Sequence, residues 1–545
     1  ISASARKIGS GSLTTNRKQS NVSGYRFVDI DILGEVFEEM ICKECFDKNL
    51  VFSELAFKRR GCASFFRLFC KSCGWELKFY TSKKTKQFFE VNRRFVYSMR
   101  TIGQGQASAK RFCGIMNMPA PPLPNAFDRH NKALAKVAKS CAQEAMLEAA
   151  KELFKIKVKK SESVAQCGVS CDGTWQKRGH SSLNGCVTAI SMDTGKCLDV
   201  AIMSKNCLGC KKLEEKNHAD EYQVLKAEHD ISGKCTANYH GSSPAMETEG
   251  IKKIFSRSEQ KYSLQYTEYY GDGDSKGYNV VRNTYSEKGV EVVKKECVGH
   301  VQKRVGTALR KLKKEKKGMG GKGKLTNSMI DKLQNYYGIA IRSNIGKLQD
   351  MKKAIHASLM HCASSKERDL HHHCPDGGDS WCKFKQDKAL KPQNPVYKPG
   401  PGLPLDVIAE VKPIYIRLSD DQLLTRCLDG KTQNQNESLN EMIWERLPKG
   451  VFVGKETLDL GVSDAVTHFN IGCQAAINVL TKQGIEPGKY CYEAMAKADS
   501  LRIAKAEYKA TDKNKLKRKQ LRAKSKKKDD TAQEKEGVTY AAGEF

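Results

Sequence analysis

The stretch Cys171-Asp172-Gly173-Thr174-Trp175 places a carboxylate at the end of a short run of small and β-branched residues. That run, residues 164–171, has the length and composition of a strand that is buried on both faces. Gly173 then permits a tight exit from the strand. An isolated Asp-Gly pair is most often only a turn, so Asp172 becomes a functional candidate only if other acidic residues meet it.

Two further strand-like runs follow directly, at residues 185–192 and 197–204. The turn signal Asp193-Thr194-Gly195 separates them, and a short polar turn of this kind joins antiparallel neighbours. The sequence therefore predicts an antiparallel three-stranded meander with Asp172 on its first strand.

A second acidic site follows the β-prone run at residues 264–270. The run ends in a glycine-rich segment, residues 271–278, which carries Asp272 and Asp274. The glycines let the backbone turn, and Asp274 or Ser275 can cap a following helix. Two strands would thus each bring a carboxylate to one edge of the sheet.

A third acid, Glu437, begins a segment in which Leu439, Ile443 and Leu447 recur at helical spacing. Such a helix can pack its apolar stripe on the sheet and present Glu437 from its first turn. Three carboxylates at one edge repel one another unless cations lie between them, and carboxylate oxygens are the ligands that Mg²⁺ prefers. Two such ions roughly 3.5–4 Å apart serve phosphodiester chemistry, so the sequence predicts a centre like that of RNase H-like nucleases and transposases.

Four separated motifs together resemble the Mutator-like transposase domain of eukaryotic DNA transposons. In chain order they are DGTWQKRG at residues 172–179, GDGDSK at 271–276, CVGH at 297–300 and NESLN at 436–440. The resemblance runs from about Gly24 to about Arg502, and the shared order of several motifs argues against a chance match.

The resemblance implies a catalytic triad of two aspartates and a glutamate (DDE) that binds two Mg²⁺ or Mn²⁺ ions. Asp172 resembles the first acid and Glu437 the third, while the second is either Asp272 or Asp274. The family also implies a large helical insertion before the glutamate and a Cys-x2-His pair after the fifth core strand. His300 of that pair is a candidate contact to the scissile phosphate.

The expected function is that of a DNA transposase, which binds transposon terminal inverted repeats, cleaves the ends and joins the 3′-hydroxyls to target DNA. Enzymes of this class act as homodimers or higher assemblies, because two transposon ends must be held together. Two alternatives use the same core. One is a domesticated DNA-binding protein, and the other is a structure-specific nuclease that cuts without joining.

The charge of the chain agrees with a nucleic-acid partner. Lys and Arg number 94 against 62 Asp and Glu, giving a formal net charge of +32, which indicates a polyanionic partner. No apolar run approaches the roughly 20 residues of a membrane-spanning helix and no signal peptide is seen, so double-stranded DNA and the nucleus are expected. The residues predicted to grip the DNA backbone are Lys177, Arg178, Lys303, Arg304, Arg310 and Lys311.

The 21 cysteines occur in close pairs, which favours structural zinc over a disulfide framework. The first predicted Zn²⁺ ligand set is Cys42, Cys45, Cys70 and Cys73. The second is Cys207, Cys210, His229 and Cys235, with His218 and His240 as alternative histidines. The third is His361, His372, Cys374 and Cys382, in a segment whose other interpretation is a His-rich surface loop. Two or three Zn²⁺ per chain are therefore expected.

The expected fold is of the α+β or α/β class. An RNase H-like mixed-sheet core is interrupted by a zinc-binding insertion and a large helical insertion, and a four-cysteine zinc β module and a helical region precede it. The helical region is either a helix-turn-helix DNA-binding unit or a plain linker bundle. The predicted boundaries are a disordered basic arm (1–24), the zinc β module (25–100), the helical region (101–160), the first part of the core (161–310) with its zinc insertion (205–240), the helical insertion (311–430), the closing helices with Glu437 (431–500) and a lysine-rich tail (501–545).

Overall fold

The computed structural model describes residues 3–8, 23–85, 87–158, 163–177, 181–216, 219–271, 275–393, 395–518 and 520–521. These residues divide into two compact units. The first unit is made of residues 1–146 and 442–545, and the second of residues 147–441. Both α5 (Pro124–Lys157) and α17 (Asn434–Arg446) include residues of each unit.

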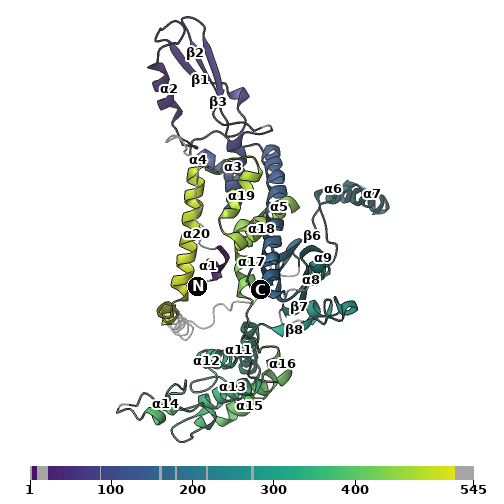
Figure 1. Ribbon diagram of the computed structural model, residues 1–545, viewed down its shortest axis with the longest axis vertical. Coiled ribbons are helices and arrows are strands. Elements are labelled where there is room, and N and C mark those ends of the chain that lie inside the picture. The colour runs from purple at the N-terminus through teal and green to yellow at the C-terminus, as the bar shows by residue number, and fades with distance from the viewer. Residues whose placement is uncertain are drawn as a thin grey trace. The chain divides into compact units, whose positions relative to one another are not determined.

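The first unit begins with a small antiparallel sheet. Its strands, in spatial order, are β1 (Leu50–Glu54), β2 (Phe65–Cys70) and β3 (Glu76–Tyr80). Helix α2 (Ile30–Glu38) lies alongside this sheet (Figure 1), where the rings of Phe37 and Phe52 are 4.9 Å apart. The core of the module is so small that it consists of Leu50 and Leu68 together with Cys42 and Cys70. Two cysteines of the predicted zinc set are thus part of the packing itself.

The rest of the first unit is helical. Its elements are α1 (Ala3–Ile8), the short 3₁₀ turn η1 (Ala56–Lys58), α3 (Glu90–Thr101), α4 (Gln106–Ile115), the first part of α5, α18 (Lys455–Ile471), α19 (Gln474–Lys482) and α20 (Lys489–Ala510). Residues from both ends of the chain share one core, which includes Val96, Phe127 and Leu134 together with Leu460 and Val479. Helices α4 and α5 confirm the helices expected in residues 101–160.

The second unit is built on a five-stranded mixed sheet. The strands are β4 (Ala165–Trp175), β5 (Asn184–Ser191), β6 (Cys197–Ser204), β7 (Leu264–Gly271) and β8 (Val293–Glu296). Their spatial order is β6-β5-β4-β7-β8. β4, β5 and β6 pair antiparallel, whereas β4 pairs parallel with β7 and β7 pairs parallel with β8. The predicted meander is confirmed.

Strand β4 is longer than the sequence suggested. Gly173 does not end it, because the antiparallel ladder with β5 continues through the pairs Gly173 with Val187 and Trp175 with Gly185. The prediction of an exit at Gly173 is therefore wrong, and Asp172 lies inside the strand, opposite Thr188.

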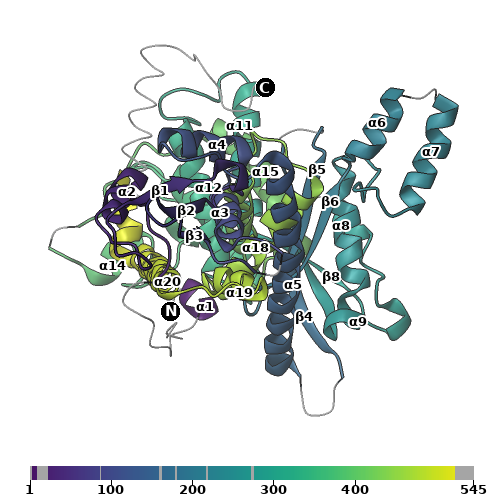
Figure 2. The same cartoon turned by 90° about the horizontal axis from the view of Figure 1, so that it is seen from above.

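Helix α8 (Ala245–Ser256) packs directly on β5 and β6. The approach is close at Gly250, where an added Cβ would lie 2.5 Å from a methyl carbon of Val187. In the chain, α6 (Leu208–Lys216) and α7 (Ala219–Ile231) lie between β6 and α8. Figure 2 shows both helices projecting away from the sheet, next to α8. Short elements complete this part: α9 (Ser258–Tyr262), α10 (Ser275–Asn279) and η2 (Ser286–Lys288).

A group of helices follows β8 and has its own hydrophobic core. They are α11 (Val298–Glu315), α12 (Asn327–Arg342), α13 (Leu348–Ala363), η3 (His371–His373), α14 (Lys383–Leu390), α15 (Leu405–Leu418) and α16 (Asp421–Thr425). In α11 the buried residues Val298, Val301, Val305 and Leu309 recur every three or four positions, which gives the helix one apolar face. The chain then returns to the sheet at α17.

Candidate active site and metal centres

Asp172 lies on β4 with its side chain half-buried. The Nδ2 atom of Asn440 donates a hydrogen bond to Oδ2 of Asp172 at 2.7 Å. The two residues are 268 positions apart in the chain, so this contact fixes α17 against the strand that carries the first predicted acid.

Three amide side chains attach α17 to the sheet: Gln433, Asn436 and Asn440, which we call the amide row. Gln433 directly precedes the helix, and the spacing of four residues places Asn436 and Asn440 on one face of it. Nε2 of Gln433 donates to the carbonyl oxygen of Cys171 at 3.1 Å, and Nδ2 of Asn436 donates to that of Ser170 at 3.1 Å. The amide row therefore contacts three consecutive residues of β4, Ser170, Cys171 and Asp172.

The amide row also determines where Glu437 lies. Glu437 is in the first turn of α17, three residues before Asn440, and side chains at this spacing have Cβ atoms about 5–6 Å apart. Glu437 therefore lies about one helical turn before the residue that contacts Asp172. The Glu437 side chain is 61% exposed and so can meet a ligand from solvent.

Asp272 and Asp274, the two candidates for the second acid, lie outside the described residues. Strand β7 ends at Gly271 and α10 begins at Ser275. The carbonyl oxygen of Tyr270 lies 3.4 Å from Nε2 of Gln433, so the described end of β7 reaches the amide row.

The predicted Cys-x2-His pair lies where β8 passes into α11. The Sγ atom of Cys297 accepts a hydrogen bond from the backbone N–H of Gln433 at 3.4 Å. His300 lies in the first turn of α11, and Nζ of Lys303, one turn further, is 3.8 Å from a carboxylate oxygen of Glu437. Neither Cys297 nor His300 belongs to a metal-binding cluster among the described residues. The pair thus lies beside the start of α17.

Several predicted DNA-binding residues form ion pairs within the protein. Arg304 donates to the buried carboxylate of Glu296 at 2.7 Å, and Arg310 donates to Asp331 at 2.6 Å. The contact of Lys311 with Glu315 is longer, at 3.7 Å, and the Lys311 side chain is 71% exposed. Lys177 is exposed, whereas Arg178 lies outside the described residues. Among the four predicted DNA-binding residues on α11, Lys303 and Lys311 therefore have the most exposed side chains, whereas Arg304 is paired with a buried carboxylate.

The first metal-binding cluster joins Cys42, Cys45, Cys70 and Cys73. The Sγ atoms of Cys42 and Cys73, and those of Cys45 and Cys70, are 3.6 Å apart. All four sulfur atoms lie within 4.8 Å of one another. The backbone N–H of Cys73 is the largest influence that lowers the pKa of Cys70 to about 7, which favours the thiolate that binds metal.

The second cluster joins Cys207, Cys210, His229 and Cys235 between β6 and α8. The Sγ of Cys207 is 3.3 Å from Nε2 of His229, and the sulfur atoms of Cys210 and Cys235 are 3.5 Å apart. Burial would raise the pKa of Cys207, but backbone N–H groups and His229 outweigh it and lower that pKa to about 5. Of the alternative histidines, His218 lies outside the described residues, and His240 is not part of the cluster.

The third cluster contains His361, Cys374 and Cys382 as predicted, but its second histidine is His371 and not His372. In the short turn η3 only His371 is buried, and its Nδ1 lies 3.4 Å from the sulfur of Cys382. His372 is exposed, with its ring 4.0 Å from that of His373. Three adjacent histidines offer the same chemistry, and the spacing in the sequence cannot choose among them. His371 also contacts the hydroxyl of Tyr397 through Nε2 at 3.0 Å, a contact of the kind that orients a ligating imidazole.

The sequence interpretation missed the amide row. A signal for it was present, because Asn436 and Asn440 interrupt the apolar stripe of Leu439 and Ile443 on a helix that faces a sheet. Buried polar side chains on such a face need partners, and carbonyl oxygens of β4 and β7 accept hydrogen bonds from the amide NH₂ groups of Gln433 and Asn436.

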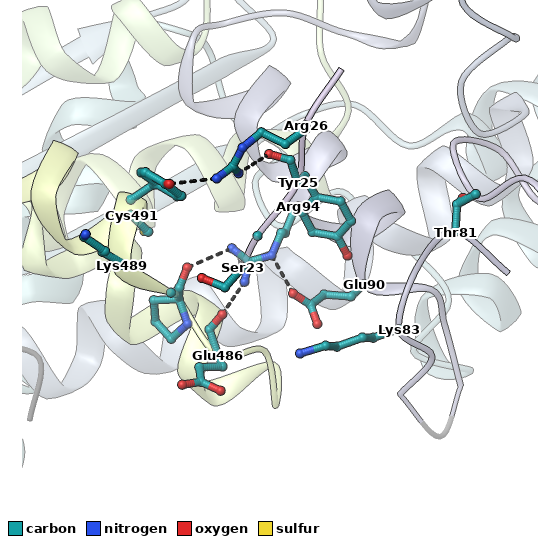
Figure 3. A pocket seen from close by; sticks show the side chains of 14 residues that line it. Ser23, Tyr25, Arg26, Thr81, Lys83, Glu90, Arg94, Glu486, Lys489 and Cys491 are labelled. Carbon is teal, nitrogen blue, oxygen red and sulfur yellow. Dashed lines mark hydrogen bonds and ion pairs between the residues drawn. The ribbon is translucent and has the colours of Figure 1, made fainter. Parts of the chain in front are cut away.

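A pocket in the first unit is lined by residues from near both ends of the chain (Figure 3). Arg26 donates to the hydroxyl of Tyr490 at 2.7 Å and to the carbonyl oxygen of Tyr25 at 2.8 Å. Arg94 donates to Glu90 at 2.7 Å and to the carbonyl oxygen of Pro487 at 3.3 Å. Each guanidinium group thus links an N-terminal segment of the pocket lining to residues 487–490.

No helix in the described ranges has the length and apolar character needed to cross a membrane.

Residues 24–382, more than half of the chain, match the family of Mutator-like transposases. The match defines the class of protein as a transposase, and the chain belongs to the Mutator-like transposase family. It covers Asp172 and all three clusters and ends before Glu437. Comparisons with curated proteins and with solved structures gave no significant match.

Proposed function

We propose that the protein is a DNA transposase that cleaves transposon ends and joins them to target DNA by two-metal-ion chemistry. The observation that carries the proposal is the attachment of α17 to β4. Asn440, three residues after Glu437, donates a hydrogen bond to Asp172 across 268 residues of chain that include another helical core. Three buried or half-buried amide side chains join these two distant segments. Buried amides are a costly way to pack a helix on a sheet, so this arrangement supports a functional role for the junction.

The sheet supports an RNase H-like core. A three-stranded antiparallel meander followed by two parallel strands on the other side of the first strand is the topology expected of that fold. The first acid is then on the central strand, the second follows the neighbouring parallel strand, and the third comes from a helix on the sheet.

Either Asp272 or Asp274 supplies the second acid. Ser170 pairs with Tyr270, and Asp172 and Asp272 each come two residues later in the chain, which favours Asp272. Replacing each aspartate with asparagine separately should identify the essential one, since only that variant should lose cleavage.

The acids fit a divalent cation because hard carboxylate oxygens are its preferred ligands. Asp172, Glu437 and the second aspartate would hold two Mg²⁺ or Mn²⁺ ions, which when bound neutralise the charge that gathers on a phosphoryl group and activate the attacking oxygen. His300 and Lys303, beside this edge, would orient the scissile phosphate. A nick at the transposon end leaves a 3′-hydroxyl, and the same residues then position that hydroxyl against target DNA.

The three clusters of Cys and His residues would bind one structural Zn²⁺ each. Four ligand atoms within 4.8 Å of one another suit tetrahedral zinc in every case.

The zinc β module and the exposed cations Lys177, Lys303 and Lys311 would contact double-stranded DNA, including the terminal inverted repeats. Because two transposon ends must be held together, the enzyme would act as a homodimer or higher assembly. Because its substrate is DNA, it would act in the nucleus.

The experiment compares the wild-type chain with Asp172→Asn on paired terminal-repeat substrates with Mg²⁺. The variant should lose cleavage and strand transfer by at least about 10³-fold, because the acid acts in the transition state, while terminal-repeat binding stays unchanged. Undiminished strand transfer by the variant rejects the assignment. A wild-type chain that cuts without joining indicates a structure-specific nuclease, and one that only binds indicates a domesticated DNA-binding protein.

A further inference from the structure

We propose that Asn440 is a positioning residue for the cation that Asp172 binds, an inference that rests on the proposed function. Nδ2 of Asn440 donates to Oδ2 of Asp172 at 2.7 Å. A hydrogen bond of this kind orients a ligating carboxylate, and the loss of such a partner typically weakens metal binding by about 10–100-fold.

Asn440 differs from the other two members of the amide row in what it holds. Gln433 and Asn436, which are 4% and 0% exposed, donate to backbone carbonyl oxygens of β4 and β7. Those contacts attach the helix to the sheet. Asn440 is half-buried at the outer end of the row and donates to a side chain that is itself a candidate ligand. Asn440 therefore both attaches α17 to the sheet and contacts a candidate ligand of the cation.

The oxygen of the same amide adds a second observation. Oδ1 of Asn440 is buried and, like Oε1 of Gln433 and Oδ1 of Asn436, has no hydrogen-bond partner among the described residues. A buried acceptor without a partner costs about 1–3 kcal/mol, so a site normally provides a donor for it. Mg²⁺ retains several waters when carboxylates bind it, and those waters are donors. We infer that Oδ1 accepts a hydrogen bond from water in the shell of the cation while Nδ2 holds the carboxylate.

The position of Asn440 on α17 links it to both acids. It lies three residues after Glu437 on the helix and in direct contact with Asp172 on the strand. A change at Asn440 should therefore alter cation binding without removing any proposed ligand. A merely structural role for Asn440 would instead lower stability and leave cation affinity unchanged.

The experiment measures Mn²⁺ binding to the zinc-loaded, full-length chain by electron paramagnetic resonance of the free ion. It compares the wild type with Asn440→Ala, Asp172→Asn and Ser438→Ala. Ser438 is exposed on the same helix and serves as the matched control. Asn440→Ala should weaken the Mn²⁺ site that depends on Asp172 by about 10–100-fold, with melting temperature and zinc content unchanged. Ser438→Ala should bind as the wild type does.

The outcomes separate the two proposals. If Asp172→Asn loses the site and Asn440→Ala binds Mn²⁺ as the wild type does, Asn440 has no positioning role and the proposed function stands. If Asp172→Asn itself binds Mn²⁺ normally, both proposals fail. Should Asn440→Ala unfold, Asn440→Leu fills the same volume without an amide, and unchanged Mn²⁺ affinity in that variant overturns the inference equally.

Discussion

The Nε2 atom of Gln433 lies 3.1 Å from the carbonyl oxygen of Cys171 and donates a hydrogen bond to it. The same atom lies 3.4 Å from the carbonyl oxygen of Tyr270. A single side chain, 4% exposed, therefore joins the start of α17 to two neighbouring strands. Each strand leads to one of the acids that we assign to catalysis, so this residue controls how firmly the site is assembled.

Replacing Gln433 with leucine should loosen α17. The variant leaves two buried carbonyl oxygens without this donor, which costs about 1–3 kcal/mol and corresponds to a roughly 5–150-fold larger equilibrium constant for local opening. Hydrogen–deuterium exchange of peptides that cover residues 434–446 measures the effect, with Ser438→Ala as the control. Unchanged exchange in Gln433→Leu would show that the amide is dispensable.

The third cluster allows a test with neighbouring histidines. His371 is buried among the sulfur atoms of Cys374 and Cys382, whereas His372 is exposed. The His371→Ala variant should purify with one zinc ion fewer per chain than the wild type, and His372→Ala should keep full zinc content. Elemental analysis of both proteins decides the matter, and zinc loss from His372→Ala alone would contradict the assignment.

The buried Asp464 should make the stability of the first unit depend on pH. Burial would raise the pKa of Asp464, but His468 and Arg446 outweigh it and hold that pKa below its usual value. The ionised carboxylate therefore stabilises the fold fully above the unfolded pKa of about 3.9, and this contribution is lost as the pH falls toward the folded pKa.

Asp464→Asn should consequently lose about 3–5 kcal/mol at neutral pH, because Arg446, with a side chain 9% exposed, loses its buried partner. Its melting temperature should also fall less between pH 5 and pH 3 than that of the wild type. Glu456→Gln on the same helix is the control, since that carboxylate is 38% exposed. Parallel pH curves for the wild type and Asp464→Asn would refute this account.

The cations of α11 should divide into two kinds. Lys311 is 71% exposed, so Lys311→Ala should reduce the slope of log affinity for DNA against log salt by about 0.9 and leave stability unchanged. Arg304 pairs with Glu296, whose side chain is 3% exposed, so Arg304→Gln should lower the melting temperature instead. Salt titrations and thermal unfolding of both variants separate the two roles. An equal reduction in the slope of log affinity against log salt in both variants would contradict this assignment.

Local patterns in the sequence predicted the parts of the fold that depend on local chemistry. Runs of β-branched residues became β4, β5 and β6, and Cys-x2-Cys pairs became cysteines that face one another. Asn440, three residues after Glu437, contacts Asp172, while the predicted convergence of Asp172 and Glu437 stays a prediction. The position of Asp272 and Asp274 stays a prediction.

The errors arose where the deciding partner is far away in the chain. Gly173 reads as a turn residue, but Val187 on the next strand keeps it in the ladder. His371 and His372 are alike until the turn η3 buries one of them. The amides of α17 looked like ordinary polar residues because their acceptors belong to strands more than 160 residues earlier.

The separation of 268 residues between Asp172 and Asn440 has a consequence for biosynthesis. At 5–20 residues per second, a ribosome needs roughly 13–54 s to add the residues between them. Throughout that interval the nascent polypeptide has the first acid but neither the helix that orients it nor Glu437. A chain that stops before α17 therefore lacks the hydrogen bond that Asn440 donates to Asp172, and under the proposed function its set of acids is incomplete.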